Sequence, residues 1–391
     1  MDENDRAYLE RALDLAENGR GRTSPNPIVG AVIERAGSVL GEGWHAGLGL
    51  DHAEIAAMRD ALRRAGRADA GAPGYVSAEA VRAVCSGATL YVTLEPCCTQ
   101  GRTPPCTKAI IEGGFSRVVA GAADPSPAVD GRGFEALKEA GVTVEVAEGA
   151  LALRAKRQNN GLRKSVKMGL PFVEYKYAMT LDGRVATDGG DSRWVSGPES
   201  RALVHKWRSW ADAVVVGAGT VAADDPTLTA RGVDCARQPL RVVLDKACSV
   251  TRDTNLVRTV DEGPVLVVCG EEVDEERRAE VQGWGVEVQA VGCGSGGRLD
   301  PAQVCRALAE RGVQTVLLEG GPRLAGSWWA AGLVDRVSAF VCPRIVSGCR
   351  CASPLVGEGA ASMGDASALQ EVEVKQVGSD VLVMGYTGGP Y

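Results

Sequence analysis

The chain has 391 residues, of which 45% are hydrophobic and 24% charged, so it is globular and long enough for two or three domains. Its formal net charge of -7 argues against broad electrostatic binding to a nucleic-acid backbone or an anionic membrane. The first ten residues are acidic where a secretory signal would be basic and then apolar, and no apolar run approaches the ~20 residues that span a bilayer. We therefore expect a cytoplasmic protein without nucleic-acid or membrane partners, and whether it forms a homo-oligomer stays open.

In the first half of the chain, helical and strand patterns alternate with short Gly-rich or Pro-rich connections, which predicts an α/β layered domain. Apolar residues from Tyr8 to Ala16 recur at helical spacing, and Gly19 would end that helix. Further elements are expected as strands over residues 89–94, 117–121 and 142–146, and as helices over residues 54–65 and 107–112.

A basic stretch with few large apolar residues covers residues 149–170, and it predicts a linker or connecting helix rather than a nucleic-acid patch. From Pro171 a second α/β alternation begins, and its strand candidates are separated by helix-length segments, which predicts a mostly parallel sheet. We therefore predict domains over residues 1–148 and 171–391. The strand candidates of the second domain cover residues 172–176, 213–216, 240–244, 265–268 and 313–318.

Three residues of the first half have the types that form a zinc site. His52, two residues before Glu54, is followed by Cys97 and then by Cys106. One imidazole and two thiolates suit tetrahedral zinc, and three protein ligands leave a fourth position for water, as in catalytic sites. Glu54, at the start of a predicted helix, can move protons to and from that water without ligating the metal. A non-catalytic zinc clasp, with His45 as the fourth ligand, is the alternative.

The spacing of the two cysteines departs from the usual Pro-Cys-x-x-Cys of zinc deaminases, because eight residues separate Cys97 from Cys106. Turn-forming residues between them can fold the loop back so that the two sulfurs meet. Cys98 is adjacent to Cys97, but neighbouring side chains point apart, and Cys97 directly follows a proline. We therefore predict that Cys97 is the ligand.

Four motifs of the first half resemble a known family. They are Ser24-Pro-Asn-Pro27, Gly43-Trp-His45, Thr93-Leu-Glu-Pro-Cys97 and Gly101-Arg-Thr-Pro-Pro-Cys106. Together they resemble the bifunctional deaminase/reductase of riboflavin biosynthesis, which implies a cytidine-deaminase-like α/β/α layered domain. The resemblance implies metal ligands at His52, Cys97 and Cys106, a catalytic acid/base at Glu54, pyrimidine contacts at Asn26 and His45, and a phosphate contact at Arg102.

In its first half, the chain departs from the pattern of this family at three places. Thr99 stands where the family usually has a histidine, and Asp51 where it usually has a proline. The stretch from Gly71 to Ser86 is longer than the family commonly carries, which predicts a surface insertion. Thr99 and Asp51 therefore keep open a different pyrimidine as the substrate.

The second half resembles the reductase domain of the same family, so the resemblance covers nearly the whole chain. The matching motifs are Ala178 to Arg184, Ser192 to Trp194, and Gly219 to Thr229 with Arg231. They imply a dihydrofolate-reductase-like α/β fold and transfer of a hydride from NADPH to the sugar carbon that bears the amine.

Two glycine-rich turns of the second half agree with a dinucleotide ligand. A predicted strand ending at Leu318 runs into Glu319-Gly-Gly-Pro322 and a helix, which is how an anion-binding helix N-terminus is built. Another predicted strand ends at Gly217-Ala-Gly219-Thr220. Either turn alone is a weak sign, since such turns are as often structural, but together they favour a dinucleotide.

By resemblance, residues at these turns and on nearby strands contact the two ligands of the reductase. The implied NADPH contacts are Ala178, Trp194, Thr220, Asp224, Gly321, Pro322, Arg323, Leu324, Ala325, Gly326 and Ser327. The implied substrate contacts are Lys176, Ser192, Arg208, Leu228, Arg231 and Glu319. Arginine suits the substrate phosphate because its guanidinium forks onto two oxygens. At Lys246, where the family usually has a serine, an amine can approach the 2′-phosphate of the cofactor or face water.

The leading hypothesis is a bifunctional enzyme with zinc and NADPH as cofactors and a small phosphorylated pyrimidine as substrate. It would deaminate 2,5-diamino-6-ribosylamino-4(3H)-pyrimidinone 5′-phosphate and then reduce the ribosyl to a ribityl side chain. A related enzyme for a different pyrimidine, and a reductase with a lapsed zinc module, are alternatives. A nucleic-acid base deaminase would need a basic groove and stacking aromatics, whereas this chain is acidic with 5% aromatic residues.

Overall fold

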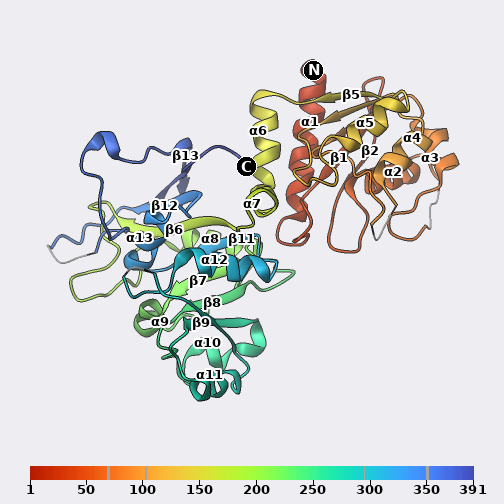
Figure 1. Cartoon of the computed structure of the whole chain (residues 1–391). Helices are drawn as coiled ribbons and strands as arrows, with labels where there is room; N and C mark the ends of the chain where they lie inside the picture. The colour runs from red at the N-terminus through yellow and green to blue at the C-terminus, as the bar shows by residue number, and fades with distance from the viewer. Residues whose placement is uncertain (68–70, 102–103, 295, 349–351) are drawn as a thin grey trace. The chain divides into compact units, whose positions relative to one another are not determined.

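The computed structural model describes residues 1–67, 71–101, 104–294, 296–348 and 352–391. The chain forms two compact units (Figure 1): unit 1 comprises Met1–Met168 with Pro390–Tyr391, and unit 2 comprises Gly169–Gly389. Within the described residues, no helix combines the length and the apolar character that crossing a membrane requires.

Unit 1 is built on a five-stranded sheet with the strand order β2-β1-β3-β4-β5. β1 pairs antiparallel with β2 and β3, whereas β3, β4 and β5 run parallel. The strands are β1 (Gly30–Arg35), β2 (Ser38–Trp44), β3 (Thr89–Val92), β4 (Arg117–Ala120) and β5 (Thr143–Val146). The helices are α1 (Glu3–Ala16), the 3-10 helix η1 (Glu17–Gly19), α2 (Ala53–Arg64), α3 (Ala78–Cys85), α4 (Cys106–Glu112), α5 (Arg132–Glu139), α6 (Gly149–Gln158) and α7 (Asn160–Met168).

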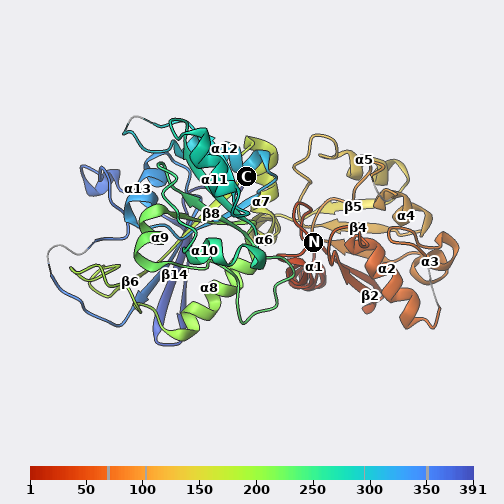
Figure 2. The ribbon, with the colours of Figure 1, turned by 90° about the horizontal axis from the view of Figure 1, so that it is seen from below.

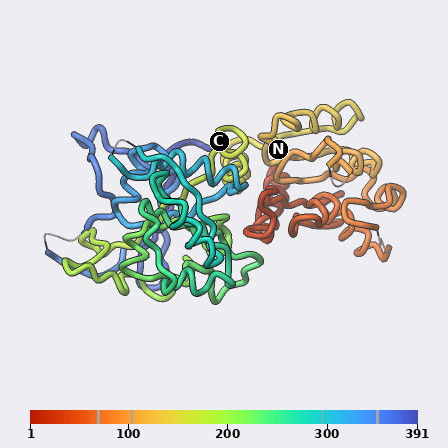
Figure 3. The backbone as a smooth tube through the Cα atoms, turned by 60° about the horizontal axis from the view of Figure 1, so that its bottom comes forward, coloured from red at the N-terminus to blue at the C-terminus, as the bar shows by residue number. Residues whose placement is uncertain are grey.

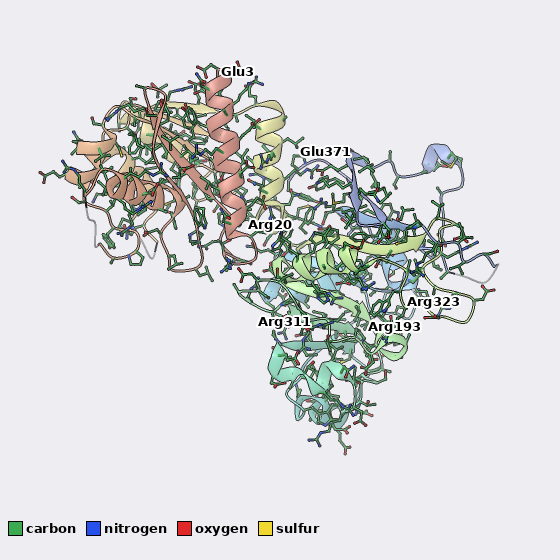
Figure 4. All side chains as sticks on the ribbon, turned by 180° about the vertical axis from the view of Figure 1, so that it is seen from behind. Glu3, Arg20, Arg193, Arg311, Arg323 and Glu371 are labelled. Atoms are coloured by element: carbon green, nitrogen blue, oxygen red, sulfur yellow. The ribbon has the colours of Figure 1, made fainter. Side chains whose placement is uncertain are left out.

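Helices cover both faces of this sheet, which gives the predicted α/β/α layering (Figure 2). Successive strand residues point to opposite faces. Leu90 of β3 therefore packs in one core with Met58 of α2, while the next residue, Tyr91, packs in the other core with Leu13 of α1 and Ala155 of α6. Figure 4 shows α1 with Glu3 at its start and Arg20 just beyond its end.

Most of the elements predicted for unit 1 are present within a few residues of the expected bounds, but three expectations need revision. Residues 149–168, within the stretch predicted as a linker or connecting helix, do form two helices, α6 and α7, but these belong to unit 1, which extends to Met168 instead of residue 148. The stretch from Gly71 to Ser86, predicted as a surface insertion, instead contains α3, whose Val81 and Cys85 are fully buried in the core. The predicted helix from Tyr8 gives way to a 3-10 turn after Ala16.

Unit 2 is built on a nine-stranded sheet with the order β10-β9-β8-β7-β11-β6-β12-β14-β13. The seven strands from β10 to β12 in this order run parallel, as predicted, and β14 and β13 pair antiparallel at one edge. The strands are β6 (Phe172–Thr180), β7 (Ala213–Gly217), β8 (Leu240–Leu244), β9 (Val265–Gly270), β10 (Glu287–Val291), β11 (Thr315–Leu318), β12 (Arg336–Cys342), β13 (Gln370–Val377) and β14 (Asp380–Tyr386).

The helices of unit 2 lie on both faces of its sheet, and their order can be followed along the tube in Figure 3. One core holds Leu308 of α12 and Trp328 of α13, and the other holds Leu256 of α10 and Val281 of α11. The helices are α8 (Pro198–Trp210), α9 (Ala218–Asp224), α10 (Asn255–Arg258), η2 (Val260–Glu262), α11 (Glu275–Gln282), α12 (Pro301–Glu310), α13 (Pro322–Ala330) and η3 (Met363–Asp365).

Candidate functional site

The three predicted metal ligands of unit 1 meet in space. His52 directly precedes α2, Cys97 follows β3, and Cys106 is the first residue of α4. Their ligand atoms all lie within 4.8 Å of one another, with Nδ1 of His52 3.6 Å from the sulfur of Cys97 and 3.3 Å from that of Cys106. Tetrahedral zinc with ordinary bond lengths holds such a nitrogen and sulfur about 3.6 Å apart. The longer spacing between the cysteines therefore does not separate the two sulfurs.

The two thiols of this cluster differ in charge, because the hydrogen bond with Cys97 and burial raise the pKa of Cys106, whereas Cys97 takes the thiolate form that binds a cation. A hydrogen bond from Cys106 lowers the pKa of Cys97 to about 4, against the effect of burial. The hydrogen bond to Cys97 in turn raises the pKa of His52 to about 9. The donor set and its burial thus fit a soft divalent metal such as zinc, whose binding would displace the protons of Cys106 and His52.

Glu54 lies in the first turn of α2, two residues after His52, and is almost completely buried. Burial raises the pKa of its carboxyl group above the ordinary range, and the neighbouring Cys97 thiolate adds to the effect. A carboxyl group with a raised pKa beside a metal site is suited to accept and return a proton. The structure thus puts the predicted acid/base next to the predicted ligands.

A buried carboxylate that our sequence analysis missed holds the loop that carries Cys97. Glu95 accepts four hydrogen bonds from backbone N–H groups of a loop and helix start far along the chain. The donors are Asp124 (3.2 Å), Gly131 (3.0 Å), Gly133 (2.8 Å) and Phe134 (3.3 Å). Glu95 stands inside the motif that we quoted, so its position was visible, but nothing in the sequence showed its partners.

Asn26 and His45, the two predicted pyrimidine contacts, are joined to each other beside the metal ligands. His45 is buried, and its Nδ1 lies 2.9 Å from the carbonyl oxygen of Asp51, so Nδ1 donates there. Nε2 then accepts from the amide nitrogen of Asn26 at 3.1 Å. Burial lowers the pKa of His45, and its ring meets that of His52 edge-on at 5.4 Å. Arg102, the predicted phosphate contact, lies outside the described residues.

The turn that carries Asn26 is held in place by a residue of the segment predicted as a linker or connecting helix. Asn159, between α6 and α7, accepts from the backbone N–H of Ile28 at 2.9 Å and donates to the carbonyl of Ile28 at 2.9 Å. A side-chain amide thus takes the place of a pairing strand. Arg163 of α7 adds a bond to the carbonyl of Ala123 at 3.0 Å.

Unit 2 contains a cleft of about 1110 Å³ at the carboxyl ends of β7, β8 and β11. Ligands of open parallel sheets bind at this edge. Its lining includes eleven of the predicted contacts, namely Lys176, Ala178, Ser192, Thr220, Asp224, Glu319, Gly321, Pro322, Arg323, Leu324 and Ser327. The lining also includes residues that the sequence analysis did not assign to a ligand, among them Tyr177, Arg184 and Arg298. Lys246, expected either to approach the 2′-phosphate or to face water, lines the cleft as well.

Six other predicted contacts are not among the described residues that line this cleft. Ala325 is fully buried in the core, and a Cβ atom at Gly326 would lie 2.0 Å from the carbonyl oxygen of Val356. Trp194 is 59% exposed, with the guanidinium of Arg201 over its ring at 4.6 Å. The remaining three are Arg208, Leu228 and Arg231.

A buried ion cluster joins the wall of this cleft to the predicted phosphate residues. Arg208 forks onto Glu319 with distances of 2.7 and 3.0 Å, and Nζ of Lys176 lies 3.8 Å from the same carboxylate. Burial lowers the pKa of Lys176. Arg231 donates to the hydroxyl of Thr229 at 2.9 Å. We had expected both arginines to be suited to phosphate, but Arg208 is engaged by Glu319.

His205, the third histidine, is a residue of this cluster that we did not predict. Its Nδ1 lies 3.1 Å from the carbonyl oxygen of Thr229 and 3.3 Å from the backbone nitrogen of Arg231. Burial lowers the pKa of His205, as does the neighbouring Arg208. The rarity of histidine in the chain was the one signal that could have pointed to it.

Both units of the chain are similar to known proteins. Residues 171–383 match the family described as the RibD C-terminal domain, and residues 2–122 match the cytidine and deoxycytidylate deaminase zinc-binding region. The chain belongs to the RibD family. The riboflavin biosynthesis protein RibD of Bacillus amyloliquefaciens is 35% identical to it over 374 residues, which cover 96% of this chain and 94% of that protein.

Solved structures of RibD proteins resemble the whole chain. Acinetobacter baumannii RibD (form 1) has a TM-score of 0.81 and 30% identity, covering 98% of this chain and 99% of that one. A diaminohydroxyphosphoribosylaminopyrimidine deaminase/5-amino-6-(5-phosphoribosylamino)uracil reductase from Thermotoga maritima has a TM-score of 0.80 and 32% identity, covering 98% of each chain. The chain is therefore a bifunctional deaminase and reductase of riboflavin biosynthesis, with the predicted fold class in both halves.

Proposed function

We propose that unit 1 holds a zinc ion through His52, Cys97 and Cys106 and removes the amino group of 2,5-diamino-6-ribosylamino-4(3H)-pyrimidinone 5′-phosphate. Unit 2 then reduces the ribosyl chain of the product with NADPH. The observation that carries this proposal is the convergence of three soft donor atoms within 4.8 Å beside the buried carboxyl group of Glu54. The Thermotoga maritima relative, named for a deaminase and a reductase of such pyrimidines, supports the choice of substrate.

Bound zinc would supply a water molecule of lowered pKa at its open fourth position. Glu54 would accept a proton from the water that attacks the ring carbon bearing the amino group. The carbon–nitrogen bond then breaks, and Glu54 delivers the proton to the leaving ammonia. The raised pKa of Glu54 supports this role because its carboxyl group can hold the proton between the two steps. Asn26 and His45 hold the pyrimidine in this orientation.

Bound NADPH would supply the hydride to the sugar carbon that bears the amine. Gly320 and Gly321, which line the cleft before α13, would let the cofactor phosphates come close to backbone N–H groups because these residues carry no side chain. As the bond from that carbon to the ring oxygen opens, Lys176 gives a proton to the oxygen. Its burial-lowered pKa favours proton loss, and Glu319 holds the amine in place.

We assign the substrate phosphate in unit 2 to Arg231 rather than to Arg208. Among the described residues, the guanidinium of Arg231 donates to two hydroxyl groups, those of Thr227 and Thr229, so a dianionic phosphate can compete for its donors. Arg208 instead keeps Glu319 ionised. Burial alone would raise the pKa of Glu319, but the charge of Arg208 outweighs burial and the pKa of Glu319 is lowered.

The test incubates the purified protein with the diaminopyrimidine, with and without NADPH, and follows ammonia and NADPH oxidation separately. Ammonia should appear without NADPH, and NADPH should be oxidised only after deamination. Glu54→Gln should keep its zinc and lose ammonia release, by about 10²–10⁴-fold, yet oxidise NADPH when the deaminated compound is supplied. Bound zinc without ammonia in the wild type would favour the lapsed module. A higher kcat/KM with another pyrimidine would favour a paralogue of different specificity.

A further inference from the structure

Asp51, the residue immediately before the ligand His52, forms an ion pair with Arg59 of α2. Oδ2 of Asp51 lies 2.8 Å from Nε of Arg59, and each side chain keeps only 21% of its surface exposed. Partial burial reduces screening by water and makes such a pair stronger than one on the open surface. The pair is therefore a defined link between the ligand loop and the middle of α2.

The same two side chains hold residues 71–75 by their backbone. Nη2 of Arg59 lies within hydrogen-bond distance of the carbonyl oxygens of Gly71 (2.8 Å), Ala72 (2.9 Å) and Tyr75 (2.7 Å), which share its two hydrogens. The other carboxylate oxygen of Asp51 accepts from the backbone nitrogen of Gly74 at 2.7 Å. Residues 71–75 are thus held directly by Arg59 and Asp51, and the ion pair between these two side chains links both sets of contacts.

The backbone of Asp51 also reaches into the proposed pyrimidine pocket. Its carbonyl oxygen accepts from Nδ1 of His45, which leaves Nε2 of His45 to accept from Asn26. Moving the Asp51 carbonyl would therefore change both the orientation and the tautomer of His45. A proline, which the family pattern usually has here, offers the same carbonyl but no carboxylate to anchor it.

We propose that Asp51 and Arg59 are positioning residues of the deaminase, which fix His45 and Asn26 for the pyrimidine by anchoring the ligand loop to residues 71–75. This inference rests on the proposed roles of Asn26 and His45 in binding substrate. Because the pair acts through His45 and touches neither the cysteines nor Glu54 in the bonds described, it sets the KM of deamination more than its kcat.

The experiment is a double-mutant cycle with Asp51→Ala, Arg59→Met and the double variant in the full chain. The matched control is Arg63→Met, because Arg63 lies one turn further along α2, pairs with Asp60 and is 76% exposed. For each protein we would measure KM and kcat for ammonia release, zinc content, and NADPH oxidation with the deaminated compound supplied. The last assay reports on unit 2 of the same molecule.

Each single variant should raise the KM of deamination about tenfold or more, with zinc content and NADPH oxidation unchanged. The double variant should be no worse than the worse single one, since both remove the same link, and Arg63→Met should match the wild type. If the wild type releases ammonia, two results would overturn the inference: a single variant with the KM of the wild type, or effects of the two substitutions that are strictly additive in the double variant. A loss of zinc equal to the loss of activity would also overturn it, because the pair would then support the metal instead of the pocket. A wild type without ammonia release would instead count against the proposed function.

Discussion

Replacing Glu95 by glutamine tests how the loop that carries Cys97 is held. Each carboxylate oxygen of Glu95 accepts two of the four backbone hydrogen bonds described above. In the glutamine variant one oxygen becomes an NH2 group, so two bonds are lost and the new donor faces two N–H groups. Hydrogen bonds to a charged group contribute about 1.5–3 kcal/mol each, so Glu95→Gln should destabilise unit 1 by about 3–6 kcal/mol.

For a unit of this size each kcal/mol corresponds to about 2–4 °C in Tm, so the Tm of unit 1 should fall by about 6–24 °C. Zinc content should fall as well, since Cys97 follows Glu95 by two residues. Differential scanning calorimetry and metal analysis measure both effects. Glu139→Gln, at the exposed end of α5, is the matched control. The reasoning is refuted if Glu95→Gln melts within about 2 °C of the wild type and keeps its zinc.

Three further predictions concern the metal, the cofactor and pH. Cys106→Ala should lose zinc and ammonia release but keep NADPH oxidation with the deaminated compound. Metal analysis and the two activity assays measure these effects, and a variant that retains zinc would contradict the assignment of Cys106 as a ligand. Lys246→Ser should raise the KM for NADPH and leave the KM for NADH unchanged, because Lys246 and Arg298 line the cleft and only NADPH has a 2′-phosphate for a cation to contact. Equal changes in the two KM values would exclude a role of Lys246 at the 2′-phosphate. Hydrogen bonds from Arg117 hold the pKa of Asp5 far below its usual range, so this carboxylate stabilises the fold above its unfolded pKa of about 3.9, and that stability is lost as the pH falls toward the folded value. The stability difference between wild type and Asp5→Asn in urea melts should therefore be larger at pH 6 than at pH 3, and a constant difference would refute it.

The parts of the site that could be predicted depend on rare residue types and on strong local patterns. With three histidines in the chain, the candidate zinc ligand was easy to find, and runs of mostly apolar residues predicted β7, β8 and β9 to within two residues at each end. The eight residues between Cys97 and Cys106 left open whether the two sulfurs lie close together. They do, with Cys106 at the start of α4.

The parts that could not be predicted depend on partners far along the chain, or on segments in which buried and exposed positions do not differ in hydrophobicity. The donors to Glu95 lie 29 to 39 residues away, so no local signal reveals them. α6 buries alanines, which look unremarkable in a basic stretch. β13 is exposed along nearly its whole length, including Val372 and Val374, so an alternation of buried and exposed positions cannot mark it.

The two-bond brace between Asn159 and Ile28 bears on any attempt to express the deaminase half alone. A protein shortened at residue 148, the boundary that the sequence suggests, would lack Asn159 and leave the Ile28 amide and carbonyl to water. The nearby Asn26 turn would then lose its support, and weak substrate binding in such a fragment would reflect where it was cut rather than what the enzyme can do. A cut that separates the deaminase from the reductase should therefore be made after Met168.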